Sequence, residues 1–344
     1  MSEEVHSGYE FEDGMFARVR SWVDIAPWIR LTRTLRILSS PSYVSATFLL
    51  CLLLRLAGVS VKETWARYSF ASLMPSSTEW TARFVNGRFD VTVGEILTIL
   101  LVPMFVLVSV FVFQVVARAG VMLTAGHDLP AASESIRLIA TRFLKSLVLV
   151  FVPFACVTVF AGLAFLVRLP GWFTEDSWWN SLIGGMFALA CVPLGLLGFG
   201  ALFAIPLGLV AMVTEPDPDP IDSLSRGYEY LYRRPLHLVF YAIVSSAILY
   251  VASFVLGGIC ATIEGFSAWM ATLVFERSGE QLGISATVLT LFESWLLTLA
   301  ISLIAGSYLL LRYNAGGQEV EEVFHSMPPA DQPLPQLPHE AYES

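Results

Sequence analysis

The sequence is poor in charged residues. Charged side chains make up 14% of its 344 residues and hydrophobic ones 56%, whereas an ordinary soluble domain has about 25% charged residues. This composition excludes an ordinary water-soluble domain. It indicates that lipid is the solvent for most of the chain.

Paired cysteines and catalytic motifs are also missing. The four cysteines lie far apart inside apolar runs, without C-x-x-C spacing, and are typical of small core residues: Cys51, Cys156, Cys191 and Cys260. No H-x-x-x-H, glycine-rich phosphate loop or nucleophile elbow occurs. The sequence therefore predicts no catalytic residue, no metal site and no cofactor, and it has no basic footprint of nucleic-acid binding. We expect a protein that is not an enzyme.

Six long apolar stretches are present instead. Each is long enough to cross a hydrocarbon core, which needs about 20 apolar residues: 42–61, 95–117, 146–167, 182–213, 236–260 and 285–311. They predict an all-α, polytopic transmembrane bundle over residues 41–312. We expect disordered acidic segments on both sides, at 1–14 and in the proline-rich stretch 313–344.

Basic residues set the expected orientation. Residues 15–40 alternate arginines with tryptophan, isoleucine and leucine, which predicts an amphipathic helix on an anionic leaflet. With this helix inside, thirteen bases fall in cytoplasmic segments and seven on the other side. The asymmetry predicts that both termini are cytoplasmic, and it makes membrane lipids the expected partners.

A polar stretch separates the fourth and fifth apolar runs, at 214–235. Asp219 followed by Pro220 is typical of a helix start, with a capping carboxylate and a proline at the first position. We expect a short helix whose apolar face carries Ile221, Leu224, Tyr228, Leu231 and Tyr232. Asp222 with Arg226, and Glu229 with Arg233, have the spacing of helical ion pairs.

The chain also resembles itself. Without gaps, residues 102–135 match 192–225 at nine of 34 positions, including Pro103 with Pro193 and Pro130 with Pro220. The match suggests a parallel repeat of 102–145 and 192–235, each a span followed by a proline-opened cytoplasmic helix and a returning span.

Polar residues inside apolar runs are the candidate functional positions. Gln114 lies alone in the second run and is expected to bond across helices. Glu293 lies in the sixth run, where it binds a cation or proton, is a carboxylate at the outer interface, or pairs with a neighbouring helix. The acids around Glu215 favour a solvated turn over a cation site.

The polar stretch carries a family resemblance. Its pattern includes Glu215, Asp222, Ser225, Arg226 and Arg234, and near the other end the chain reads YLLLRYNAGGQEVEEV. In both places the sequence resembles a group of uncharacterised polytopic bacterial membrane proteins of the planctomycete type. The resemblance implies a helical membrane fold in the bacterial inner membrane, and it implies no activity.

Two functions fit these observations. The first is a non-enzymatic integral membrane protein that organises the membrane or serves as a subunit of a larger assembly, with protein partners still to be identified. The alternative is a transporter or channel for a neutral or lipid-like substrate. A polar cavity at the midplane that reaches Gln114 would favour the alternative.

Overall fold

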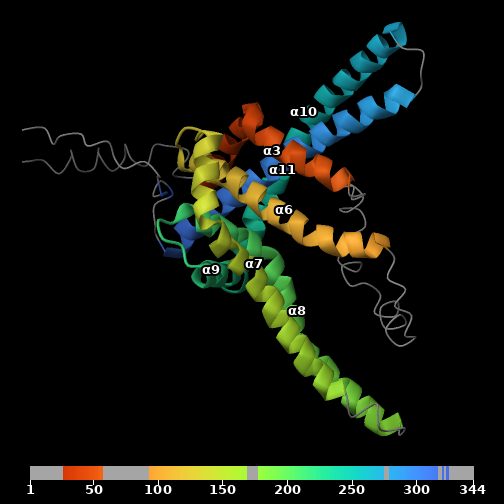
Figure 1. Cartoon of the computed structure of the whole chain (residues 1–344). Helices are drawn as coiled ribbons and strands as arrows, with labels where there is room; N and C mark the ends of the chain where they lie inside the picture. The colour runs from red at the N-terminus through yellow and green to blue at the C-terminus, as the bar shows by residue number, and fades with distance from the viewer. Residues whose placement is uncertain are drawn as a thin grey trace, which may run out of the picture.

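The computed structural model describes residues 26–56, 93–168, 177–274 and 279–316, together with 320, 323 and 324. Every element in these ranges is a helix (Figure 1). They are the 3-10 helix η1 (Pro27–Ser39) and the α-helices α3 (Pro41–Leu56), α6 (Val93–Ala125), α7 (Ala132–Arg168), α8 (Ser177–Thr214), α9 (Pro220–Arg233), α10 (Pro235–Val274) and α11 (Gly279–Gly316).

Five helices are long and apolar enough to cross a membrane, namely α6, α7, α8, α10 and α11. A sixth span results if α3 is counted together with η1, from which it bends by 80°. The predicted polytopic all-α bundle is therefore confirmed. The predicted first span ends at residue 61, outside the described residues.

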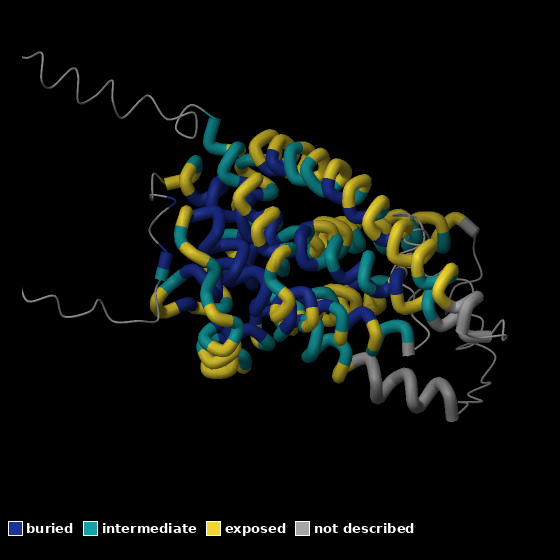
Figure 2. Tube along the Cα trace, turned by 90° about the horizontal axis from the view of Figure 1, so that it is seen from above, coloured by how far each residue is buried: buried dark blue, intermediate teal, exposed yellow. Residues whose placement is uncertain are grey.

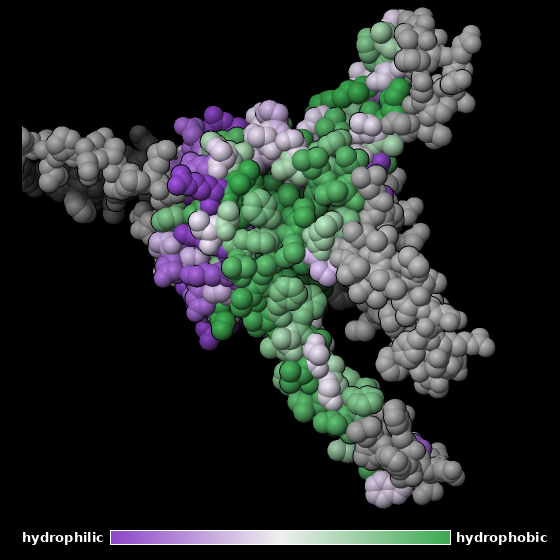
Figure 3. Space-filling view, in the orientation of Figure 1, coloured by the Kyte–Doolittle hydropathy of each residue, from purple (hydrophilic) through white to green (hydrophobic). Residues whose placement is uncertain are grey.

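The helices form a packed hub from which three helix pairs diverge (Figure 1). We call hub the end that contains η1, α9 and the adjoining ends of α6, α7, α8, α10 and α11. We call legs the diverging parts of the pairs α3 with α6, α7 with α8, and α10 with α11. Buried residues concentrate in the hub (Figure 2), and hydrophilic residues gather at its outer surface while the legs are apolar (Figure 3).

Small residues bring the hub helices together. A Cβ added at Gly120 of α6 would lie 2.6 Å from the Cα of Ser302 in α11, and one at Gly227 of α9 would lie 2.5 Å from the carbonyl oxygen of Ala204 in α8. Gly306 of α11 leaves the same kind of space for Leu31 and Thr124. Such close approach is how helices gain packing energy in lipid.

The basic helix differs from its prediction. Residues 15–25 lie outside the described part, and the helix that begins at Pro27 is a 3-10 helix rather than an α-helix. Its sequence explains this, because three residues per turn place Leu31, Thr34 and Ile37 on one face, and all three are buried. The arginines at positions 30, 33 and 36 form a second face, and Thr32, Leu35 and Leu38 a third.

The end of the chain corrects a predicted boundary. Residues from 313 onward were expected to be disordered, but α11 continues to Gly316, and Val320 and Val323 are buried in the core of the hub. Phe324 donates its backbone N–H to the carbonyl of Thr214 at 3.1 Å. Apolar side chains here extend the packed region past the last span.

The two proposed repeat units agree only in part. Segments 132–145 and 220–233 both lie in the hub, as a parallel repeat requires. The first is continuous with the returning span as the base of α7, whereas the second is the separate helix α9. Ser135 and Ile139 are buried while the aligned Ser225 and Glu229 are exposed, so the two segments bury opposite faces. The repeat itself stays a prediction.

Candidate functional site at the helix ends of the hub

The start of α9 follows its sequence. The Asp219 carboxylate accepts a hydrogen bond from the Ile221 amide at 3.1 Å, which caps the helix. Arg226 pairs with Asp222 at 2.7 Å and Arg233 with Glu229 at 2.8 Å, as the spacing predicts.

The buried face of α9 matches the predicted one only in part, since Leu224 belongs to both. Ser223, Leu224, Gly227 and Tyr230 are buried, whereas Ile221 is 64% and Tyr232 50% exposed. Gly227 decides this, since its missing side chain lets α9 lie directly on the backbone of α8 at Ala204. Tyr228 and Tyr232 then donate hydrogen bonds to the α8 carbonyls of Leu197 and Leu196, at 3.0 and 2.6 Å.

Glu215, Asp222 and Arg226 form one charged group. Arg226 binds both carboxylates, and the Glu215 side chain is only 17% exposed. Burial raises the pKa of Glu215, although Arg226 acts in the opposite direction. Burial by itself lowers the pKa of Arg226, but Glu215 and the neighbouring acid and tyrosine outweigh it and raise that pKa. The group is a partly buried ion pair that holds α9 to the end of α8.

Two arginines close the end of α8. Arg118 of α6 donates to the carbonyl of Val213 at 2.9 Å, and Arg142 of α7 donates to the carbonyls of Met212 and Glu215 at 3.0 and 2.7 Å. A second nitrogen of Arg142 donates to Pro216 at 2.7 Å. The last carbonyls of a helix have no intrahelical partner and carry a partial negative charge. Arg118 and Arg142 therefore act as side-chain caps supplied by neighbouring helices.

The C-terminal segment completes this arrangement. Arg118, which is 3% exposed, also donates to the carbonyl of Phe324. The guanidinium carbon of Arg142 lies 4.8 Å from the centre of the Phe324 ring, a cation–π contact. The segment is thus fixed to α6, α7 and α8 by the same two arginines.

Arg234 plays the same part for α11. It donates to the carbonyls of Asn314 and Ala315, the latter at 3.2 Å, in the last turn of α11. The Asn314 side chain donates to the Tyr241 hydroxyl at 2.8 Å. Ser225, one of the residues that carry the family-like pattern, is exposed and donates to the carbonyl of Asp222 in its own helix.

The two candidates within the spans lie away from the α9 charged group. Gln114 is 1% exposed and donates to Ser146 of α7 at 2.7 Å, so it bonds across helices as predicted. Glu293 is 8% exposed and lies 3.5 Å from Arg55 of α3, which also donates to the carbonyl of Ala286 at 2.6 Å. Glu293 therefore has the interhelical pairing that the sequence left open.

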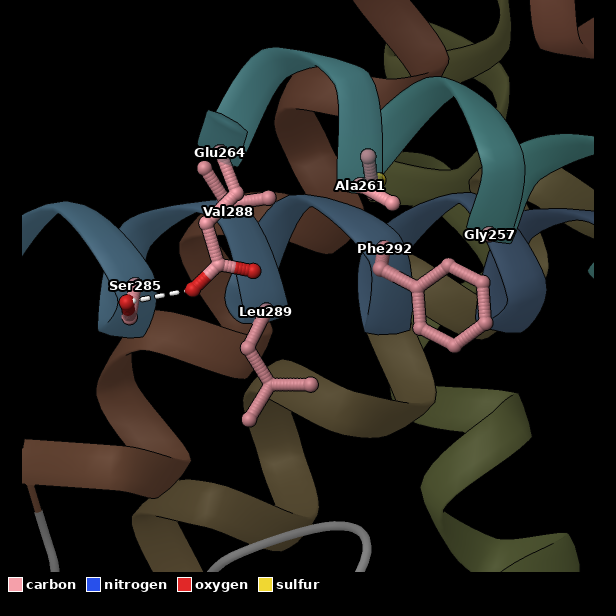
Figure 4. Close-up of a pocket in the computed structure, with 8 residues that line it drawn as sticks. Gly257, Ala261, Glu264, Ser285, Val288, Leu289 and Phe292 are labelled. Carbon is pink, nitrogen blue, oxygen red and sulfur yellow. Dashed lines mark hydrogen bonds between the residues drawn. The ribbon is translucent and has the colours of Figure 1, made fainter. Parts of the chain in front are cut away.

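An open pocket of about 320 Å³ lies between α10 and α11 (Figure 4). Ser285 of α11 donates to the Glu264 carboxylate of α10 at one end, and Phe292 borders the other. Most of its remaining lining is apolar, so it offers one satisfied carboxylate and no convergent set of polar groups. Gln114 lines neither this pocket nor the groove described below.

Arg118, Arg142, Arg226 and Arg234 form what we call the arginine cluster, which binds helix ends. Its guanidinium groups are engaged by backbone carbonyls, carboxylates and an aromatic ring, and the described residues contain no group of three His, Cys, Asp or Glu arranged to hold a metal. Sequence reasoning missed Arg118 and Arg142 as members of this cluster. The available signal was an arginine close to the end of each apolar run, where a neighbouring helix also ends.

No protein-family model matches this chain, and no curated protein or solved structure matches it.

Proposed function

We propose that this polytopic protein is non-enzymatic and organises the membrane as a subunit of a larger assembly. In this role the hub is a rigid base, and the legs offer apolar surfaces to other spanning helices. The residues that would act are those that fix the hub, among them Glu215, Arg226 and Arg234.

The contrast in burial between helices carries the proposal. Within the most apolar 18-residue stretch of each helix, 67% of the residues of α6 and 56% of those of α11 are buried. The corresponding shares are only 22% for α7 and 17% for α10. Large side chains such as Leu189 and Phe254, 73% and 82% exposed, cover the legs. Diverging legs leave long helix faces without a protein neighbour among the described residues, and partner helices fit such faces.

The alternative of transport has less support. It requires a polar path at the midplane, whereas Gln114 is enclosed between α6 and α7 and bonded to Ser146. The hub around it is filled by apolar side chains such as Val115, Val116 and Leu303. A packed interior of this kind suits a fixed base better than a moving gate.

Photocrosslinking in the native membrane tests the proposal. A benzophenone amino acid is placed at Leu189 or Phe254 in the legs, and at the fully buried Leu310 as the control. An assembly subunit gives a protein adduct of one defined mass from a leg position and none from Leu310. Adducts with lipid alone from both legs would contradict the assembly and favour a lipid-handling role.

A further inference from the structure

A second feature of the structure, independent of the arginine cluster, is an apolar groove between η1 and α10. Its volume is about 490 Å³, within the range of small-molecule sites. One wall is the third face of η1, formed by Thr32, Leu35 and Leu38. The other wall is α10, with Ala247, Val251 and Val255 among its residues.

The geometry of η1 produces this groove. With three residues per turn, one face is used entirely for the core and the next is left turned toward α10. The groove face of η1 extends from Thr32 to Leu38, six residue steps or roughly 12 Å at the rise of a 3-10 helix. A small residue, Ala247, on the opposite wall leaves the space between the two helices unfilled. The result is an elongated apolar channel on the outside of the bundle.

We propose that this groove seats an acyl chain of an anionic phospholipid, whose phosphate is held by Arg33 and Arg36. Because α10 is a membrane-spanning helix with a largely unburied surface, hydrocarbon chains are the molecules that this groove meets. Its lining is apolar except for Thr32, whose hydroxyl donates to the carbonyl of Ile29 within η1, so it offers a narrow apolar path.

The charge beside the groove selects the headgroup. Arg33 follows Thr32 and Arg36 follows Leu35 in the sequence, so both bases lie on the face of η1 that neighbours the groove face. Both are exposed. Arginine binds phosphate oxygens in a bidentate manner. A basic helix at the membrane surface also attracts anionic lipids by about 1 kcal/mol per charge.

The present partners of these arginines leave them available to a phosphate. Arg36 lies 3.6 Å from Asp128, with the two side chains 67% and 95% exposed, and such exposed pairs contribute little. The guanidinium of Arg33 lies over Gly126, 2.8 Å from where a Cβ would stand. Gly126 has a φ of +95°, so glycine both permits this turn and leaves room for the arginine.

Native mass spectrometry of the full chain tests the site. The protein is taken from nanodiscs with equal phosphatidylglycerol and phosphatidylcholine, and retained lipids are counted after transfer to detergent. We expect one phosphatidylglycerol to be retained with about thirtyfold preference over phosphatidylcholine, as two surface arginines imply. Equal retention of the two lipids by the unaltered protein would overturn the headgroup assignment.

Two variants separate the chain seat from the headgroup site. Ala247→Trp fills the groove from an exposed position, and Ala242→Trp adds the same bulk at an exposed position outside it. We expect the first to lose both lipids about tenfold and the second to retain them. Arg33→Gln with Arg36→Gln should keep a lipid but lose the preference, unlike Arg137→Gln with Arg233→Gln. Equal retention by the two tryptophan variants, or an unchanged preference in the Arg33/Arg36 variant, would overturn the proposal.

Discussion

Residues 130–145 and 220–235 each follow a long membrane-spanning helix and each begin at a proline, but the first becomes the base of α7 and the second forms the separate helix α9. The difference falls at one aligned position. Pro235 begins α10, whereas Lys145 continues α7. Proline lacks the N–H that a helix interior requires and restricts the residue before it.

This break gives α9 a freedom that the base of α7 does not have. The base of α7 must follow the direction of its own span. Free of that constraint, α9 lies on α8 through Gly227, whose aligned counterpart Arg137 is exposed. Two segments with related sequences therefore bury opposite faces, because a single proline decides whether the segment can turn independently.

The largest effect is expected from moving the break. Lys145→Pro puts a proline in α7 at the position that aligns with Pro235. It removes one intrahelical hydrogen bond and should destabilise the protein by about 3 kcal/mol or more. Pro235→Ala, at the first position of α10, should have a small effect. The half-unfolding temperature in detergent measures both. Equal losses in the two variants would contradict the role given to the proline.

A slightly smaller effect is expected at the close contact of α9. Gly227→Leu forces a side chain onto the backbone of Ala204, and overpacking of this kind costs about 1 to 3 kcal/mol. The matched change Arg137→Leu, at the exposed aligned position, should leave the unfolding temperature nearly unchanged. If the two substitutions were equally harmful, the opposite burial of the two segments would be wrong.

Removing the cap of α9 should cost less. Asp219→Ala leaves the Ile221 amide without its carboxylate partner, a loss of about 1 kcal/mol. Leu129 stands at the aligned position, so the base of α7 has no such cap. Asp217→Ala serves as the control, because that side chain is 93% exposed and makes only a surface ion pair with Lys145, which contributes little. A larger loss in the control than at Asp219 would contradict the capping role.

The smallest effect concerns pH. Burial raises the pKa of Glu215 above 4.5, so the folded protein holds this proton more tightly than the unfolded chain does. Stability should therefore fall as pH rises from 4.5 through the folded pKa. Glu215→Gln should flatten this decline in the unfolding temperature. The aligned position in the other segment is Ala125, which has no ionisable side chain. A wild type that gains stability relative to the variant would show that Arg226 outweighs burial.

The sequence predicted what depends on neighbouring residues. The start of α9, its ion pairs and the cross-helix role of Gln114 follow from local spacing and from the cost of an unsatisfied amide in lipid. The buried face of α9 could not be predicted in the same way. It depends on how closely Gly227 approaches α8, and that distance is a property of two helices.

The 3-10 helix and the arginine caps differ in how far they were predictable. The spacing of Arg30, Arg33 and Arg36 repeats every three residues, so a three-fold period was visible in the sequence. Arg118 and Arg142 act on the end of α8, far away in the chain. Only the packed structure brings that end to them.

The central place of α11 has a consequence for biosynthesis. This helix packs against η1, α3, α6, α8 and α10, yet it leaves the ribosome after all the other described spans. Until it is inserted, Gly120 of α6 and Leu31 of η1 face lipid or solvent instead of Ser302 and Gly306. The pair α7 with α8 and the helix α9 can pack earlier. A nascent chain interrupted before α11 would therefore keep this hairpin but lack the hub, and quality-control proteases would meet its unprotected faces.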